Sequence, residues 1–552
     1  MVQTGLSRRT MLAAGAGSAA LLLGGRAWAA EDATPTAVIE TTSGKVRGLR
    51  SDGLSRFFGI RYGEDTARHR FQPSRRVQPW TGVRDCNALG AKTPQGPITL
   101  RGVMGKVDMR APGLAVMAAI QGTVPDLPES EDCLFLNVIT PEASPARKRP
   151  VMVWLHGGAF AMGSGFDAMN DGSMLARRGD IVYVSLNHRL NAMGFLYLGA
   201  LHEDFADSGN AGMLDIVLAL EWVRDNIAAF GGDPDDVTIF GESGGGCKVS
   251  TLLGMVPARG LFHKAIAQSG PVLKLVEKQD ADAIAQQTLA ALGIAKADVH
   301  KLQGADYRAI IKAASAVRLP PLPEGGIASR SLAPLVDGRS IPAHPFDPVA
   351  TEISRDVPLM IGTCKDEATL FLASDPELGR MSIAAARKHF DGEFGERAGP
   401  AFDAYRTAFP GSDPSYWVTS MMTDRMFRSQ SIDQADRKAW QNAAPVYMYR
   451  VDYEPRVLDR LLKAPHGTEV PLVFGTKVPA AFIGTGPEVD ALSDTMMRAW
   501  LNFVKTGDPS QPGLAWPRYD AERRANMIFD TACRVVADPD RVARDPAARG
   551  MV

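Results

Sequence analysis

The pentapeptide Gly241-Glu242-Ser243-Gly244-Gly245 decides the fold of this chain. It directly follows the apolar, largely β-branched run Val237-Thr238-Ile239-Phe240 and precedes a helix-compatible stretch, residues 248–255. A G-x-S-x-G motif between a strand and a helix holds its serine in a strained turn, and the flanking glycines avoid clashes with neighbouring backbone. The turn exposes the serine oxygen above a helix N-terminus, which favours developing negative charge. The pattern is typical of a nucleophile elbow and indicates a serine hydrolase.

Two further unbroken apolar runs, residues 151–155 and 181–186, suit strands that are buried on both faces of a parallel sheet. Between the second run and the elbow, apolar residues recur from Met213 to Phe230 at the spacing of a helix that packs along one face. The order strand, helix, strand, elbow, helix predicts an α/β fold with a large, mostly parallel central sheet flanked by helices.

Weaker patterns extend this prediction toward both ends of the chain. A Ser43-Gly44 turn between two short apolar runs predicts an N-terminal antiparallel hairpin. Residues 357–361 and 445–449 predict further strands, and residues 494–504 predict a helix. Because no internal repeat or low-complexity linker is present, we expect residues 30–552 to form a single catalytic domain. Insertions that are helical or irregular are expected at roughly 275–350 and 370–440.

The composition excludes several classes of protein. The chain has 552 residues, of which 45% are hydrophobic and 22% are charged, so neither disorder nor a fibrous architecture is indicated. The formal net charge of −1 argues against a nucleic-acid-binding protein, which would carry a basic excess. The acidic segment Asp233-Pro-Asp-Asp236 predicts a turn before the elbow strand rather than a cation site. We therefore expect no metal and no cofactor.

The first 29 residues differ in character from the rest. Arg8-Arg9 opens an apolar segment that ends at Leu23, and Ala27-Trp28-Ala29 supplies small residues at the positions that a signal peptidase reads. This pattern predicts a twin-arginine signal peptide over residues 1–29 and an exported, periplasmic or secreted bacterial protein. The apolar segment is shorter than the roughly 20 residues needed to span a bilayer. We expect no stable membrane span.

Five cysteines are few for an oxidising compartment, and their odd number leaves at least one unpaired within the chain. Most of them are expected to be buried thiols that act as small hydrophobic side chains. They are Cys86, Cys133, Cys247, Cys364 and Cys533.

A nucleophilic serine needs a base that accepts its proton and an acid that holds the base. In the α/β-hydrolase fold these follow in the chain order serine, acid, histidine. His466 is the leading base candidate because it follows the predicted strand at 445–449 near the C-terminus. Glu367 is the acid candidate because it follows the strand at 357–361, and its neighbour Asp366 is its nearest rival.

Several ordered motifs, with the elbow among them, resemble those of the type-B carboxylesterases, the family that also holds the cholinesterases. The resemblance extends over almost all of the chain after residue 29. It is carried by residues 57–62, 130–137, 154–160, 187–190, 209–212, 230–234, 260–270 and 365–367, the segment at His466, and residues 516–519.

The resemblance implies an α/β-hydrolase fold and roles for six residues. Ser243 would be the nucleophile, His466 the general base and then acid, and Glu367 the carboxylate that orients His466. Backbone N–H groups of Gly158, Ala159 and Gly244 would form the oxyanion hole. The expected reaction is hydrolysis of a carboxylic ester through an acyl-enzyme.

The chain departs from the family pattern in two places. The cysteine that usually pairs with the one at position 133 is replaced by Thr93, so Cys133 lacks its usual partner, and Cys86 is the one alternative. Residues 95–130 contain no aromatic residue to hold a quaternary ammonium group. They contain Met104, Met109 and Met117, which suit either an apolar pocket wall or ordinary packing.

These departures favour small to medium apolar or aryl esters over choline esters as substrates. As an assembly, we expect a monomer or a homodimer.

Two other functions remain as alternatives. Residues 241–248 resemble a phosphate-binding loop, but Cys247 separates the second glycine from Lys248, and Val249 stands where a metal-binding hydroxyl is required. A P-loop nucleotide hydrolase is therefore disfavoured. A non-catalytic adhesion or scaffold protein on the same fold is disfavoured because Ser243, Glu367 and His466 are all present.

Overall fold

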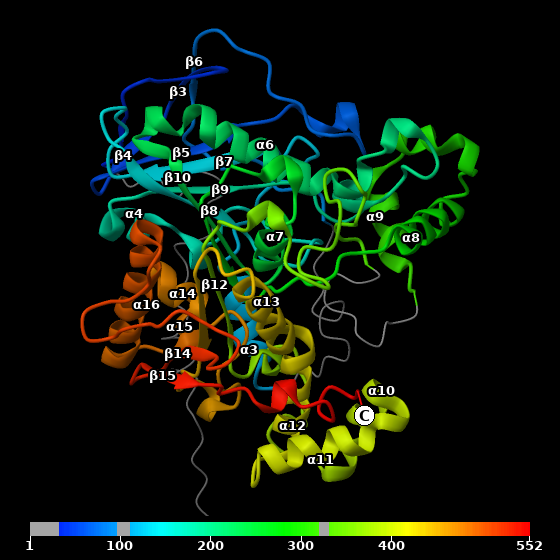
Figure 1. Ribbon diagram of the computed structural model, residues 1–552. Helices are drawn as coiled ribbons and strands as arrows, with labels where there is room; N and C mark the ends of the chain where they lie inside the picture. Colours follow the sequence, from blue (N-terminus) through cyan, green and yellow to red (C-terminus); the bar gives the residue numbers. More distant parts are fainter. Residues whose placement is uncertain (1–31, 96–110, 320–330, 552) are drawn as a thin grey trace, which may run out of the picture.

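The computed structural model describes residues 32–95, 111–319 and 331–551, and the structural statements below concern these residues. Its centre is a sheet with the strand order β1-β4-β5-β7-β9-β8-β10-β11-β12-β13-β14-β15 (Figure 1). The strands are β1 Thr34–Pro35, β4 Leu49–Ser51, β5 Leu54–Arg61, β7 Phe135–Thr140, β8 Arg149–Leu155, β9 Val182–Leu186, β10 Gly232–Glu242, β11 Lys264–Gln268, β12 Leu359–Cys364, β13 Val446–Val451, β14 Ala525–Phe529 and β15 Arg534–Ala537.

The pairing confirms the predicted fold class. From β9 to β14 every neighbouring pair runs parallel. The N-terminal strands β1, β4, β5 and β7 pair antiparallel, and β15 adds one antiparallel strand at the other edge. The predicted N-terminal hairpin is also present, since β2 (Ile39–Thr41) and β3 (Gly44–Arg47) pair antiparallel in a small separate sheet with β6 (Val83–Asp85).

Both faces of the central sheet are buried, as its unbroken apolar strands predict. In β8, Val151, Val153 and Leu155 belong to one hydrophobic core, whereas Met152 and Trp154 belong to another. Helix α6 (Ala211–Asn226) contributes to the first core and α16 (Pro487–Thr506) to the second. Figure 1 shows these two helices on opposite sides of the sheet. Alternate side chains of β8 therefore pack into the two cores, one on each face of the sheet.

Helical segments surround the two cores. Helices α8 (Lys278–Ala291) and α9 (Tyr307–Ala316) enclose a third hydrophobic cluster, and α10 (Ile383–Phe394), α11 (Ala398–Ala408) and α12 (Pro414–Thr423) enclose a fourth. Helix α12 packs against the 3-10 turn Glu367–Thr369 that follows β12, and Figure 1 shows α10, α11 and α12 together at the lower end of the view. A single π-helical turn, Asp424–Arg428, joins α12 to α13 (Ser429–Ala439).

The observed elements differ from the prediction in several bounds and in one assignment; the predicted helix at 494–504, for example, is α16, Pro487–Thr506. The predicted helix at 213–230 is α6, which begins at Ala211 and ends in a 3-10 turn, Ile227–Phe230. The predicted turn at Asp233–Asp236 is wrong, because these residues belong to β10. Their register with β8 shifts between Gly232 and Val237, so the extra residues form a bulge inside the strand rather than a separate turn.

No helix within the described residues is both long enough and apolar enough to span a membrane. The predicted signal peptide, residues 1–29, lies outside the described residues.

Burial of α16 on the sheet predicts a large cost for removing its central ring. Trp500 is fully buried, packs against Tyr449 and Phe529, and donates a hydrogen bond from Nε1 to Oε1 of Gln268 at 3.1 Å. We expect Trp500→Ala to lower stability by about 3–5 kcal/mol. Thermal unfolding followed by circular dichroism measures the loss.

Trp440 provides the matched control, since 60% of its surface is exposed. Trp440→Ala should leave the unfolding midpoint nearly unchanged. Equal midpoints for the two variants would contradict the described packing of α16.

Candidate active site

The elbow has the strained geometry that its sequence predicts. Ser243 links β10 to α7 (Gly244–Leu252) and has φ 55° and ψ −124°, a conformation that residues with a side chain rarely adopt. A Cβ atom added to Gly241 would lie 2.5 Å from the carbonyl oxygen of Leu155, and one added to Gly245 would lie 1.9 Å from it. Glycine is therefore required at both positions, because the elbow passes directly against the end of β8.

Backbone hydrogen bonds fix the turn. The Ser243 N–H donates to the carbonyl of Gln268 at the end of β11, at 2.9 Å, and the Ser243 carbonyl accepts from the N–H of Cys247, at 3.0 Å. Ser243 itself remains partly exposed, whereas its two neighbours in the chain are buried. The turn thus presents the hydroxyl group while the backbone beneath it is held by the sheet.

His466 and Glu367 meet across the carboxyl ends of β12 and β13. Nδ1 of His466 lies 2.5 Å from Oε2 of Glu367. Glu367 is completely buried, and its Oε1 accepts hydrogen bonds from the Ser269 hydroxyl at 2.6 Å and from the Cys364 N–H at 2.7 Å. The rival Asp366 instead accepts from the Ala464 N–H at 3.3 Å. Glu367, not Asp366, is therefore the carboxyl group in contact with the imidazole.

The other ring nitrogen of His466 faces a second carboxylate. Nε2 lies 3.2 Å from Oε1 of Glu242, the residue before Ser243, although the angles are not those of a hydrogen bond. Within the described residues, the Ser243 hydroxyl forms no hydrogen bond with His466. The histidine is thus held between two glutamates, one at each ring nitrogen, beside the partly exposed serine.

A third glutamate lies beneath this pair. Glu469, in the first turn of α14 (Glu469–Phe474), has Oε1 3.1 Å from the Ser269 hydroxyl and Oε2 2.9 Å from Sγ of Cys364. Ser269 therefore links the carboxyl groups of Glu367 and Glu469. Burial, together with the charge of Glu367, raises the pKa of Glu469. Because Ser269 has one hydroxyl proton and gives it to Glu367, a protonated Glu469 is well suited to donate to Ser269.

The three carboxyl groups change the titration of His466. Burial lowers its pKa, but negative charge on Glu242, Glu367 and Glu469 outweighs this effect and raises the pKa to about 9. Burial raises the pKa of Glu242 to about 8, and a protonated Glu242 no longer acts on the imidazole. The two groups titrate together. The pKa of His466 therefore lies above that of a free histidine, because the carboxylates of Glu242 near Nε2 and of Glu367 at Nδ1 favour the charged imidazolium.

The predicted oxyanion loop lies against the elbow. Gly158 and Ala159 both have positive φ, 87° and 52°. A Cβ atom added to Gly244 would lie 2.2 Å from the Ala159 carbonyl oxygen, so the loop and the start of α7 are in direct contact. Within the described residues, the N–H groups of Gly158, Ala159 and Gly244 donate to no acceptor. Three unengaged donors therefore meet where the serine is exposed.

Two phenylalanine rings line one side of the histidine. The ring centroids of Phe371 and Phe427 lie 5.3 Å and 4.9 Å from that of His466. Phe427 belongs to the π-helical turn between α12 and α13, and Phe371 follows the 3-10 turn that starts at Glu367. The π-helical turn thus places an aromatic ring against the imidazole, as such turns often do at functional sites.

The model of the carboxylesterase family matches residues 35–540. The chain belongs to the carboxylesterase family. It is 35% identical to the para-nitrobenzyl esterase of Bacillus subtilis over 515 residues, which is 92% of this chain and 97% of that protein. It is 33% identical to the phenmedipham hydrolase of Pseudarthrobacter oxydans, over 92% of this chain and 98% of that protein.

A solved structure agrees in fold. The carboxylesterase of Geobacillus stearothermophilus superposes with a TM-score of 0.78 at 36% identity, and the match covers 93% of this chain and 100% of that one. The protein is therefore an ester-hydrolysing enzyme with the α/β-hydrolase fold.

The cysteines of this carboxylesterase form no disulfide bond. All five belong to the described residues and are free thiols, so the alternative pairing of Cys86 with Cys133 is wrong. The Thr93 hydroxyl lies beside Cys133, in the place that the resemblance gives to the usual partner cysteine, and donates to the His188 carbonyl at 2.6 Å. Burial raises the pKa of both the Cys86 and Cys133 thiols to about 12.

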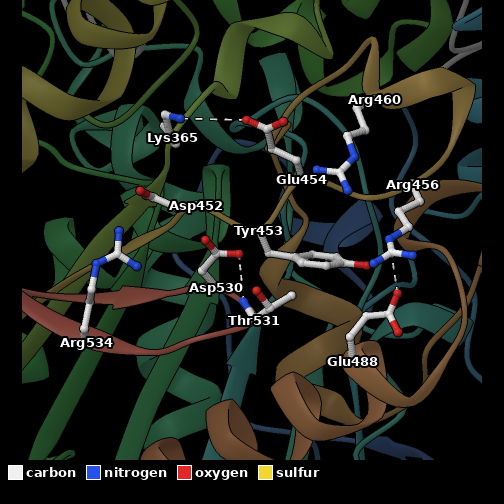
Figure 2. Close-up of a pocket in the computed structure, with 10 residues that line it drawn as sticks. All are labelled: Lys365, Asp452, Tyr453, Glu454, Arg456, Arg460, Glu488, Asp530, Thr531 and Arg534. Atoms are coloured by element: carbon white, nitrogen blue, oxygen red, sulfur yellow. Dashed lines mark hydrogen bonds and ion pairs between the residues drawn. The ribbon is translucent and has the colours of Figure 1, made fainter.

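A separate pocket of roughly 400 Å³ opens near the ends of β12, β13 and β14, and Figure 2 shows its lining. Eight of the ten lining residues are charged, four of each sign, and Lys365 is directed at Glu454 and Arg456 at Glu488. The pocket contains neither Ser243 nor His466. Its paired charges do not suit an apolar ester, so we assign it no part in the reaction.

One group within the described residues has the composition of a metal site, although none was predicted. His202, Asp204 and His300 lie at the surface, with Nε2 of His300 3.0 Å and Nδ1 of His202 3.4 Å from Oδ2 of Asp204. Nδ1 of His202 already accepts a hydrogen bond from the Asp204 N–H at 3.2 Å. Its single lone pair is thus engaged, and the cluster is better described as a hydrogen-bonded group at the surface.

The sequence prediction missed the two additional carboxylates and their bridging serine. Glu242 stands inside the elbow motif and Glu469 stands three residues after His466, so both positions could have been examined. Ser269 carries no local signal, since it lies 98 residues from Glu367 and 200 from Glu469 along the chain. Met104 and Met109, the proposed wall residues, lie outside the described residues, and Met117 is partly buried against the core beneath α16.

The charge of Glu242 predicts a change in the pH profile. His466 must be neutral to accept a proton, so activity rises as pH increases through its pKa. Glu242→Gln removes a carboxylate that raises this pKa, and we expect the acidic limb of kcat/KM to move to lower pH by about 1 unit. Initial rates of p-nitrophenyl acetate hydrolysis across pH 5–10 measure the shift.

Asp366→Asn is the control for this experiment. Asp366 is also a buried carboxyl group next to Glu367, but it contacts the Ala464 backbone rather than His466. Its removal should leave the position of the limb unchanged. A shift in the Asp366→Asn profile, together with an unshifted Glu242→Gln profile, would contradict the assignment of contacts at His466.

Proposed function

We propose that this carboxylesterase hydrolyses esters through an acyl-enzyme formed on Ser243, with His466 as the base and Glu367 as the acid that orients it. The observation that carries the proposal is the strained Ser243 turn beside three unengaged N–H donors. A backbone held in this conformation is costly, and such strain is typical of functional sites. The contact between His466 and Glu367 adds the base and its supporting acid.

In the first half of the reaction, Ser243 Oγ attacks the ester carbonyl carbon and its proton passes to Nε2 of His466. The carbonyl π electrons move to the oxygen, and the N–H groups of Gly158, Ala159 and Gly244 stabilise this oxyanion, each by about 3 kcal/mol. Glu367 stabilises the imidazolium through Nδ1. As the tetrahedral intermediate collapses, the carbon–oxygen bond to the alcohol breaks and His466 protonates the alcohol.

In the second half, water replaces the alcohol. His466 takes a proton from the water molecule, the resulting hydroxide attacks the acyl carbon, and the Ser243 oxygen leaves with the proton from His466. The carboxylic acid is released and the free enzyme is restored. The raised pKa makes neutral His466 a stronger base toward the protons of Ser243 and of water, and the acidic limb of the pH profile marks where the imidazole becomes neutral.

We propose small to medium apolar or aryl esters as the substrates. Phe371 and Phe427 form an apolar side beside His466, which suits an uncharged ring or chain. The similar protein from Bacillus subtilis is named for a para-nitrobenzyl ester activity. The twin-arginine signal predicted at residues 1–29 belongs to the same proposal and would place the reaction outside the cytoplasm.

Substitution of the three proposed catalytic residues tests the mechanism. Ser243→Ala and His466→Ala should each lower kcat by several orders of magnitude, and Glu367→Gln should lower it somewhat less, since the imidazole remains in place. Steady-state hydrolysis of p-nitrophenyl butyrate measures the losses. Turnover equal to that of the wild type in any variant would remove that residue from the mechanism.

A fluorophosphonate probe distinguishes the enzyme from a scaffold protein of the same fold. The wild type should be labelled at one site, and Ser243→Ala should not be labelled. Labelling of both proteins to the same extent, or of neither, would contradict Ser243 as the nucleophile.

The apolar side of His466 predicts the order of substrates. We expect kcat/KM for p-nitrophenyl esters with acyl chains of about two to six carbons to exceed that for acetylcholine by at least about 100-fold, because residues 95–130 contain no aromatic ring to bind a quaternary ammonium group. Parallel rate measurements at matched concentrations check this. Efficient hydrolysis of acetylcholine would contradict the proposed substrate class.

A further inference from the structure

Lys248 is completely buried in α7, five residues after Ser243. Its Nζ donates hydrogen bonds to the carbonyl oxygens of His156, at 2.8 Å, and Ala159, at 2.9 Å. Within the described residues, no carboxylate lies within ion-pair distance of this ammonium group. Lys248 therefore donates hydrogen bonds to both ends of the segment that carries the N–H groups of Gly158 and Ala159.

Burying a lysine in this way is costly. An ammonium group loses its hydration on burial, and only a carboxylate or several acceptors compensate for the loss. Burial lowers the pKa of Lys248 to about 7, because the ammonium group loses its hydration. An apolar residue at this buried position of α7 would have a lower desolvation cost. The contacts with the loop are therefore what a lysine adds here.

The loop needs such a support because its conformation is strained. Ala159 has φ 52° and Gly158 has φ 87°. For an oxyanion hole, the carbonyls of the loop must point away from the serine while the N–H groups of residues 158 and 159 point toward it. Reversal of a single peptide plane would replace a donor by an acceptor and abolish the site.

Each carbonyl of this loop, from residue 156 to residue 159, accepts a hydrogen bond. The Gly157 carbonyl is bound by Nδ1 of His156 at 2.8 Å, and the Gly158 carbonyl accepts from the N–H groups of Ala161 and Met162. Lys248 binds the carbonyls on either side of these two, His156 and Ala159. It thus fixes the peptide planes that flank the two donor-bearing planes, and it does so from the same helix whose first N–H, that of Gly244, is the third donor.

We infer that Lys248 is the positioning residue of the oxyanion hole, holding the loop 156–159 so that the N–H groups of Gly158 and Ala159 converge with that of Gly244. The inference rests on the proposed function of this site. Lys248 does not touch the reacting atoms, because both of its contacts are with loop carbonyls. Lys248 is also the residue that makes residues 241–248 resemble a phosphate-binding loop, and here its ammonium group binds loop carbonyls instead.

Replacement of Lys248 by methionine tests the inference. Lys248→Met keeps a long side chain in the same space but has no donor, so the loop loses both contacts. We expect kcat for p-nitrophenyl butyrate to fall by about 10- to 100-fold, since a displaced oxyanion donor costs on the order of 100-fold or more. KM should remain within about twofold, because the ground-state ester does not depend on the hole.

Lys438 offers a matched control elsewhere in the fold. It is also buried and donates from Nζ to two consecutive backbone carbonyls, Ser354 at 2.6 Å and Arg355 at 2.8 Å. Lys438→Met should lower the thermal unfolding midpoint as Lys248→Met does, but it should leave kcat per active site unchanged. Titration with a fluorophosphonate counts the folded sites, so that kcat is compared per competent molecule.

A second measurement reports the hole directly. An aryl trifluoromethyl ketone forms a tetrahedral adduct with the serine and places its oxyanion in the hole, whereas the matching methyl ketone binds without forming this adduct to a comparable extent. Lys248→Met should weaken the inhibition constant of the fluorinated ketone by about the same factor as kcat, and that of the methyl ketone by less than twofold. Lys438→Met should change neither constant.

Wild-type kcat per titrated site in Lys248→Met, or an equal loss in Lys438→Met, would overturn the inference. Should Lys248→Met fail to fold, Lys248→Gln is measured in the same way, because its shorter side chain cannot reach both carbonyls; unchanged kcat would overturn the inference there as well. Failure of the wild type to hydrolyse esters or to react with the fluorophosphonate would instead refute the proposed function, which keeps the two outcomes distinct.

Discussion

The close approach of the elbow to the end of β8 is the constraint on which the site depends. Gly245 lies so near the Leu155 carbonyl that no side chain fits between them. Because β8 ends there, the loop that follows it reaches the start of α7 and lies against Gly244. The nucleophile and the proposed oxyanion donors are thus neighbours because two backbones are in contact, and the sheet that aligns β8 with β10 fixes their separation.

Electrostatic interactions add a second level of organisation. A histidine between two glutamates, with a third glutamate below, is an expensive arrangement in a buried site. The Ser269 hydroxyl and the Cys364 N–H reduce this cost at Glu367, because both donate hydrogen bonds to its carboxyl group. Burial raises the pKa values of Glu242 and Glu469, so the charge of these two groups, and with it their effect on His466, depends on pH.

How much of this was predictable differs from residue to residue. The strands and the elbow could be recognised because their apolar periodicity and glycine spacing are local properties of the chain. His466 and Glu367 could be ranked by chain order and by the strands that they follow. The roles of Ser269 and the contact of His466 with Glu242 could not be predicted, because tertiary packing alone brings these side chains together. The bulge in β10 was missed for the same reason: residues that favour a turn locally lie between Gly232 and Val237, and both of these pair with β8.

The free thiols have a consequence for how this fold is held together. All five cysteines, each within the described residues, are free thiols, and four of them are buried. The described part of the chain is therefore held together without a covalent cross-link. Its cohesion comes from two apolar cores on a continuous sheet. Reductants should leave such a molecule intact, and the high pKa values of the Cys86, Cys133 and Cys247 thiols, about 12, make these three poor targets for electrophiles and for thiol exchange.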